Sequence, residues 1–422
     1  MSRLLPSPGR RKYNDDDDEH EDPLLRDNRD SSEEDVELAD LELDGRERTP
    51  VNHYRRRDEP PKRVEWYWIA SALAVCVAGF TLNTEATAYF EDALDWKKPF
   101  ATLYLTHGSL VLPWIVHIFY LRWKNRSTPY QSWVRDYNNT LRSSISTIDA
   151  FATSGPSLIL KRRGQQGGPL DYLAATMAIV TIVLTISGVS WFTSLSLTTP
   201  ADLTAIYNCA TFFAAAFSVP ILKEKLGRLS ILAVALSIGG TFIIAYGDTT
   251  AEHAESAIGA SRFLGNIIAC VGAVAFGLYE VLFKKWACSS RPETQGSSVP
   301  LTLAASALTG FYTLGVLWIA FPILHIFGVE EFALPSLHAL LWIVIAVLSA
   351  AVSITLLAIL VVWTDPVFGS MANVLSVFFV ALADWYVWGL SPSLATYIGG
   401  ALILVAFGML SYDTLGKEKE KD

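Results

Sequence analysis

Two asparagines stand at matching places in apolar stretches of this 422-residue chain. Each is followed three residues later by a hydroxyl side chain, Asn208 by Thr211 and Asn373 by Ser376. A carboxamide both donates and accepts hydrogen bonds. Without a partner it would cost roughly 1–3 kcal/mol in an apolar interior. The two pairs therefore predict either a polar binding site or polar contacts between packed helices.

Ionisable side chains inside apolar stretches are further candidate substrate contacts, because an isolated charge is costly in a membrane. Glu85 could bind a proton or a cation, or be solvated near the membrane surface. His107 could contact a ligand, or its neutral imidazole could donate to a backbone carbonyl. Glu280, next to Tyr279, could bind a ligand or pair with Lys284 one helical turn later.

The motifs of common enzyme mechanisms are missing from the sequence. It has no P-loop, dinucleotide fingerprint, zinc-protease helix or nucleophile elbow. Its four cysteines lack metal-ligand spacing, and three of them lie in apolar stretches. The sequence therefore predicts neither an enzyme nor a metal or cofactor site, and the missing P-loop argues against ATP-driven pumping.

Ten apolar stretches set the predicted fold class. Apolar residues make up 51% of the chain and charged residues only 18%, which is typical of a polytopic membrane protein. Each stretch approaches the roughly 20 residues that a helix needs to cross a bilayer. The predicted fold is all-α, with transmembrane helices over 66–88, 100–121, 172–195, 201–222, 229–246, 263–283, 301–323 and 340–362 and two more within 364–413.

Residues 198–248 and 364–413 look like two copies of one helix pair. Pro200 and Pro366 open the copies, the asparagines follow eight and seven residues later, and each second helix carries a Gly-Gly pair. Five helices per half is an odd number, so tandem halves must cross the membrane in opposite directions. We therefore expect two inverted five-helix repeats, over 64–248 and 249–413.

The distribution of charge predicts the orientation of the chain. The net charge of −9 arises mostly in an acidic N-terminal tail, residues 1–63, whose composition predicts disorder. Basic residues concentrate before the first span, in the connection 122–170 and around 223–228. Cations in such loops mark the cytosolic side, so both termini, including 414–422, are expected in the cytosol. Leu24-Leu25 forms an imperfect acidic dileucine sorting signal.

Several short motifs occur in an order that resembles a known family. They are Lys98-Pro99-Phe100, the stretch from Thr199-Pro200-Ala201 to Glu224-Lys225, Tyr279-Glu280-Val281 with Lys284-Lys285, residues 308–335, and Asp365-Pro366. Over residues 65–413 the chain resembles the drug/metabolite transporter superfamily with two EamA-type repeats. Within it, the chain is most similar to the F-like branch of solute carrier family 35 and its fungal vacuolar-membrane relatives.

This resemblance implies a secondary transporter of a small polar metabolite, working by alternating access in a vacuolar or other endomembrane. Two departures weaken the transfer of individual contacts. Ser353-Ile354-Thr355 stands where family members often carry Ser-Asp, and Trp388-Gly389-Leu390 replaces a Gly-Glu-Lys turn. The candidate site residues do not indicate one particular class of substrate.

Other functions and partners follow from the same observations. The alternative to transport is a membrane scaffold or receptor that docks partners through the acidic tail. The expected partners are the lipid bilayer and a small-molecule substrate, with a proton, a counter-substrate or a second copy of the chain as further candidates. Nucleic acid is not an expected partner.

Overall fold

The computed structural model describes residues 66–148, 151, 168–195, 197–198, 200–247, 259–288, 298–389 and 392–419. These residues are mostly helical, and none of them forms a β-strand. The all-α prediction is therefore confirmed for this part of the chain. The predicted acidic tail with Leu24-Leu25 lies outside the described residues, as does part of the connection 122–170.

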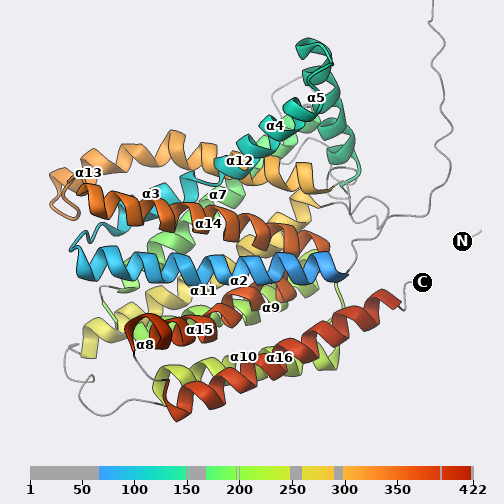
Figure 1. Ribbon diagram of the computed structural model, residues 1–422. Coiled ribbons are helices and arrows are strands. Elements are labelled where there is room, and N and C mark those ends of the chain that lie inside the picture. The colour runs from blue at the N-terminus through green and yellow to red at the C-terminus, as the bar shows by residue number, and fades with distance from the viewer. Residues whose placement is uncertain are drawn as a thin grey trace, which may run out of the picture. The chain divides into compact units, whose positions relative to one another are not determined.

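Five spans form the first part of the helical region, and two of these spans consist of two consecutive helices (Figure 1). A short π-helix, η2 (Tyr89–Ala93), continues the first span. The helices of these spans are α2 (Trp66–Ala88), α3 (Pro99–Gly108) with α4 (Val111–Lys124), α7 (Pro169–Leu195), α8 (Pro200–Asn208) with α9 (Ala210–Leu222), and α10 (Arg228–Tyr246).

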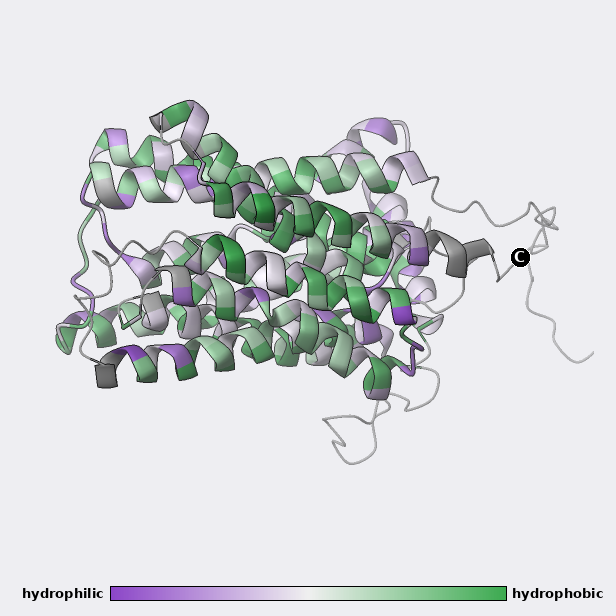
Figure 2. Ribbon diagram, turned by 90° about the horizontal axis from the view of Figure 1, so that it is seen from below, coloured by the Kyte–Doolittle hydropathy of each residue, from purple (hydrophilic) through white to green (hydrophobic). Residues whose placement is uncertain are grey.

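Five further spans follow. They are α11 (Gly259–Ala287), α12 (Ser298–Val316) with the turn η6 (Leu317–Ile319) and α13 (Ala320–Ile326), α14 (Leu337–Trp363), α15 (Pro366–Trp388) and α16 (Leu394–Lys419). In all, ten helical stretches in the described part of the chain are long and apolar enough to cross a membrane. Figure 2 shows hydrophobic residues along most of their length. The predicted ten-span membrane fold is confirmed.

Successive spans run in opposite directions, so every span has one end at each side of the helical region. We name these two sides after residues near the two ends of α11. We call them the Arg262 end, where α11 begins, and the Lys284 end, where it finishes. The spans α2, α7, α10, α12 and α15 begin at the Lys284 end, and the others begin at the Arg262 end (Figure 1).

Two groups of helices pack closely. In bundle A, α11 contacts α7, α8 and α9, and in bundle B, α2 contacts α14 and α15. Between these bundles, α9 contacts α15 and α11 contacts α14. Of the remaining spans, α10 packs against α16, and α12 packs against α3 and α4.

Two spans are interrupted close to candidate site residues. The fourth span breaks at Cys209, directly after Asn208, where the Cys209 N–H donates to the Ile206 carbonyl at 3.1 Å. The second breaks directly after His107 and Gly108, and the Leu110 N–H donates to the His107 carbonyl at 3.3 Å. The sequence predicted unbroken helices here. Such irregular turns within helices often lie at functional sites.

The connection 122–170 contains a helix that the sequence prediction missed. This helix, α5 (Tyr130–Ser146), buries Leu141 and Ile145 against the ends of the spans. The Trp114 indole N–H donates to the Tyr137 hydroxyl at 3.0 Å, and burial raises the pKa of Tyr137. The apolar residues of α5 recur at helical spacing, but the prediction considered only stretches long enough to span a membrane.

The Gly-Gly pairs of the two predicted copies meet where α10 packs against α16. A Cβ atom on Gly240 would lie 2.7 Å from the carbonyl oxygen of Gly399. Small residues let membrane helices approach this closely. A Cβ atom on the neighbouring Gly239 would have no other atom within 4 Å, so only one glycine of the pair is needed for the contact.

Gly240→Ala should therefore lower the midpoint of thermal unfolding. The added methyl group must push α10 away from α16, at a cost of roughly 1–3 kcal/mol. Gly239→Ala is the matched control and should unfold at or above the wild-type midpoint, because alanine favours helix over glycine. Equal midpoints for the two variants would contradict the close contact.

Candidate functional site

Aromatic rings from α8 and α11 form a row inside bundle A. The row runs from Tyr207 through Phe276 and Tyr279 to Phe283, with successive ring centroids 5.9, 5.7 and 6.0 Å apart. The Tyr207 hydroxyl hydrogen-bonds to the hydroxyl of Ser187 on α7. We call these four aromatic residues the ring row. The contact of Tyr207 with Phe276 joins α8 to α11, and the other three rings continue the row along α11.

Glu280 follows Tyr279 on α11, and its side chain is only 1% exposed. Within the described residues, neither of its carboxylate oxygens has a hydrogen-bond partner. The carboxyl group of Glu280 lies within electrostatic range of Tyr207, Tyr279 and Asp365. Asp365 precedes α15 and accepts a hydrogen bond from the Phe368 N–H at 2.8 Å. Glu280 of bundle A thus has a carboxyl group of bundle B in its neighbourhood.

Lys284 does not form the ion pair with Glu280 that the sequence offered as an alternative. Its ammonium group lies 2.9 Å from Glu224 Oε1, in the turn after α9. It also donates to the carbonyl oxygen of Thr364, in the turn between α14 and α15, at 2.7 Å. A lysine so placed joins the two bundles across the Lys284 end.

A second contact reinforces this junction. The Cys288 thiol lies 3.6 Å from the carbonyl oxygen of Val362 near the end of α14. Buried apolar side chains of α11 and α14 pack in the same region, among them Phe283, Ala358 and Val362. At the Lys284 end the two bundles are thus joined by a lysine-to-carbonyl bond, a thiol contact and apolar packing.

The candidates of the fourth span are buried. Asn208 is 5% exposed and Thr211 is 1% exposed. Ala215, one turn beyond Thr211, packs in an apolar cluster with Met371 and Leu375 of α15. Within the fourth span, α9 therefore packs against the ninth span, whereas α8, which carries Asn208, contacts α7, α10 and α11.

The candidates of the ninth span lie on α15, which packs against α9. Asn373 is half-buried, and Ser376 is buried. The Ser376 hydroxyl donates to the Asn373 carbonyl oxygen at 2.7 Å, so its proton is used within the helix. The structure thus brings together the spans that carry the two asparagines, and the site assignment itself stays a prediction.

Glu85 lies elsewhere, on the wall of a cavity of about 1150 Å³ between α2, α15 and α16. Apolar side chains make up most of this wall, and Tyr89 and Trp342 line it near the Arg262 end. Near the other end, Trp66 and Phe368 pack edge to face with centroids 5.9 Å apart. Glu85 is therefore separate from the residues around Glu280.

His107 lies in a contact between the second and third spans. It is buried, and a Cβ on Gly188 of α7 would come within 3.1 Å of its Cε1 atom. Its Nδ1 atom has no partner among the described residues. Those residues also contain no group of three or more His, Cys, Asp and Glu side chains that could hold a metal ion.

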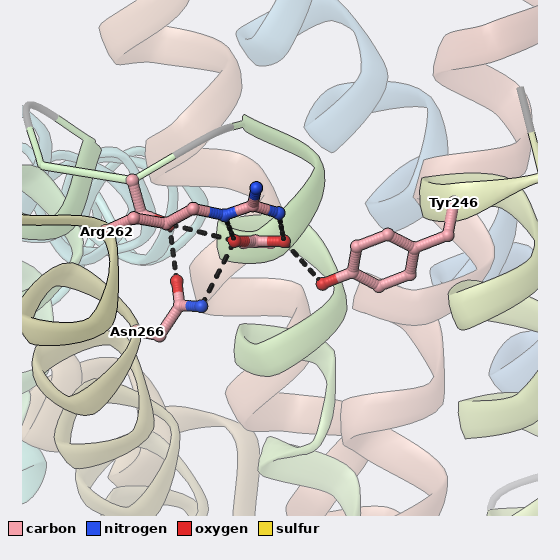
Figure 3. Close-up of polar contacts among 5 residues, drawn as sticks. Tyr246, Arg262 and Asn266 are labelled. Atoms are coloured by element: carbon pink, nitrogen blue, oxygen red, sulfur yellow. Dashed lines mark hydrogen bonds and ion pairs between the residues drawn. The ribbon is translucent and has the colours of Figure 1, made fainter. Parts of the chain in front are cut away.

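A polar network that the sequence analysis missed joins α8, α10 and α11 at the Arg262 end (Figure 3). Asp202 is 1% exposed at the start of α8. Its carboxylate accepts from Arg262 Nε at 2.6 Å and Nη2 at 3.0 Å, and from Asn266 Nδ2 at 3.1 Å. The Tyr246 hydroxyl donates at 2.5 Å, and the Thr198 hydroxyl, 3.2 Å away, shares its one proton with Asn266 Oδ1. The buried charge is therefore compensated and fully hydrogen-bonded.

One signal could have revealed this network. Asp202 stands inside the predicted fourth span, while Arg262 stands just before the predicted sixth. Because successive spans alternate in direction, the fourth and the sixth begin at the same side of the membrane. The opposite charges of Asp202 and Arg262 could therefore meet there. The sequence did not show that these two spans are neighbours.

Comparison with known proteins gives several matches. Residues 131–246 match the model of the EamA-like transporter family. An uncharacterized transporter of Schizosaccharomyces pombe is 24% identical over 79% of this chain and 92% of its own length. Solute carrier family 35 member F4 of Mus musculus is 29% identical over 29% of this chain and 23% of its own length. A solved crystal structure aligns with a TM-score of 0.49 at 15% identity, covering 83% of this chain and 99% of that one.

The sequence matches agree with the ten-span helical fold. The match to the EamA-like family, residues 131–246, lies within the part of the chain whose motifs carried the predicted resemblance. The resemblance to EamA-type transporters and to the F-like branch of solute carrier family 35 is therefore confirmed.

Proposed function

We propose that the protein is a secondary transporter that moves a small polar organic metabolite by alternating access. The similarity to transporters supports the general function. The observation that carries the mechanism is the reciprocal packing of the ten spans. Such packing is expected when two halves of a transporter are inverted copies.

The reciprocity can be followed contact by contact if each of the first five spans corresponds to the span five later. The contact of α7 with α11 then corresponds to that of α14 with α2, and both contacts occur. The contacts of α8 and α9 with α11 correspond to that of α15 with α2, which also occurs. The pairs α4–α12, α9–α15 and α10–α16 correspond to themselves, and all three are present.

This pattern suggests which helices move together. Bundle A contains spans three, four and six, and bundle B contains spans eight, nine and one, so each bundle takes one helix from the other half of the sequence. Within bundle A, Asp202 and Arg262 hold the fourth span to the sixth at one end, and Glu224 with Lys284 does so at the other. We propose that the bundles rock as units, with the Lys284 end closed in this conformation.

We propose Asn208 and Asn373 as substrate contacts, one from each bundle. They lie on spans that pack against each other, and Asn208 adjoins the helix break at Cys209. An amide there can replace hydrogen bonds that a polar substrate loses on leaving water. The neighbouring Thr211 and Ser376 hydroxyls would line the same path. Glu85 and His107 stay candidates for coupling to a proton or counter-substrate.

Uptake by proteoliposomes from a panel of polar metabolites tests this function. Asn208→Leu and Asn373→Leu should each reduce uptake of the accepted substrate about five- to a hundredfold, because a hydrogen bond is worth roughly 1–3 kcal/mol when its loss leaves a polar group unpaired. Asn83→Leu is the comparison: its amide donates to the Ala346 carbonyl at 2.9 Å, so that variant should lower stability instead. Unchanged uptake in both site variants would remove the asparagines from the mechanism.

We also propose that the Lys284 end faces the cytosol and that the protein resides in a vacuolar or other endomembrane. The basic residues at the Lys284 end support this orientation. An impermeant maleimide added to sealed vesicles with the cytosolic face outward should label Lys225→Cys, and should label Leu334→Cys only after permeabilisation. The opposite result would reverse the orientation. Homodimer formation stays a prediction.

A further inference from the structure

We propose that the metabolite carried at this site is an organic cation, bound by Glu280 beside the ring row. This inference names the substrate class of the proposed transporter and so rests on the proposed function. Three features carry it, namely the unpaired buried carboxylate, the aromatic side chains next to it, and its position between the two bundles.

The carboxylate of Glu280 lacks the compensation that a buried charge needs. Its side chain is 1% exposed, and its oxygens have no hydrogen-bond partner in the described part of the chain. Asp365 adds a second negative charge instead of balancing the first. Asp202 shows the contrast, since that buried carboxylate accepts hydrogen bonds from an arginine, a tyrosine and an asparagine. A buried carboxyl group without a protein partner favours a positively charged ligand that can pair with it.

Lys284 lies one turn from Glu280 on α11, yet its ammonium group is held by Glu224 and the Thr364 carbonyl. The lysine therefore contributes to closing the Lys284 end, and its positive charge does not pair with Glu280. A cationic ligand could supply that charge without displacing the lysine. In this arrangement Lys284 joins the bundles at the Lys284 end, and Glu280 remains available to bind the substrate.

The aromatic side chains of the ring row suit an organic cation better than a hydrated metal ion. Tyr207, Phe276 and Tyr279 offer ring faces and edges, with centroids 5.9 and 5.7 Å apart. Aromatic faces attract ammonium and quaternary ammonium groups, and desolvation strengthens this attraction. A metal ion would need several ligands, whereas the described residues hold no group of three His, Cys, Asp or Glu side chains that could bind one.

The position of the site matches a transported ligand. Glu280 belongs to α11 of bundle A, whereas Asp365 precedes α15 of bundle B. A cation between them would be attracted by both bundles at once. Its binding would therefore favour the conformation in which the Lys284 end is closed around it.

Thermal unfolding of the purified full chain in nanodiscs tests the proposal without requiring transport. The probes are choline, the N-methylnicotinamide cation and benzylammonium, each beside a neutral counterpart: the carbon isostere of choline, nicotinamide and benzyl alcohol. At least one cation should raise the unfolding midpoint saturably, and its neutral counterpart should not. In Glu280→Gln the apparent affinity for that cation should fall at least about thirtyfold, the effect expected when one partner of a buried charge pair is removed.

Glu331→Gln is the matched control, because it removes the same charge from an exposed residue near the other end of the helices. It should keep the wild-type response to the cation. Stabilisation by cation and neutral counterpart alike, an unchanged affinity in Glu280→Gln, or no response to any cation would each overturn the proposal. Uptake of a neutral or anionic metabolite that survives Glu280→Gln would also overturn it, while leaving the proposed transport function intact.

Discussion

Replacing Arg262 with alanine should lower the free energy of unfolding by about 2–3 kcal/mol, because it leaves the buried Asp202 carboxylate without a cation. Fully buried ion pairs lose more when one partner is removed. The side chain of Arg262 is 36% exposed and that of Asp202 only 2%, so water compensates part of the loss. The fourth, fifth and sixth spans should separate first at the Arg262 end.

A double variant distinguishes this effect from a general weakening of the helix. Asp202→Asn removes the charge that Arg262→Ala would leave unpaired, so combining them should restore part of the lost stability. Arg228→Ala is the control, since Arg228 is exposed at the start of α10. The measurement is the unfolding midpoint of each purified variant. A double variant less stable than Arg262→Ala alone would contradict the role assigned to the network.

Much of the fold could be predicted from the sequence because membrane spans have a strong local signal. Apolar runs of sufficient length placed all ten spans, and the prolines at Pro200 and Pro366 marked two of the helix starts. The breaks at Cys209 and after Gly108 could not be predicted in this way, because no proline marks them. The helix α5 was missed since it packs on the ends of spans and is too short and polar to cross a membrane.

The candidate site was only partly predictable. Glu280 was found because a carboxylate in an apolar run is conspicuous, whereas its missing partner depends on where Lys284 reaches. Asp202 was overlooked because its partners come from three other parts of the chain. Likewise, nothing in the sequence placed Glu85 in a cavity apart from Glu280, because that separation depends on how α2 packs against α15.

The central claim is that bundles A and B rock as units around the site, and Lys284→Ala provides a ligand-free way to displace that equilibrium. The substitution removes both the ion pair with Glu224 and the bond to the Thr364 carbonyl. It therefore weakens a junction between the bundles at the Lys284 end. In a rocking transporter, opening one end should narrow the other.

Pulsed electron paramagnetic resonance on two spin-labelled pairs tests this most directly, in a background lacking the four native cysteines. One pair, Tyr67→Cys with Lys225→Cys, reports on the Lys284 end, and the other, Phe263→Cys with Leu337→Cys, reports on the Arg262 end. All four positions are exposed. With Lys284→Ala, the first distance should lengthen while the second shortens. A change confined to the first pair, or lengthening of both, would contradict the rocking of two bundles.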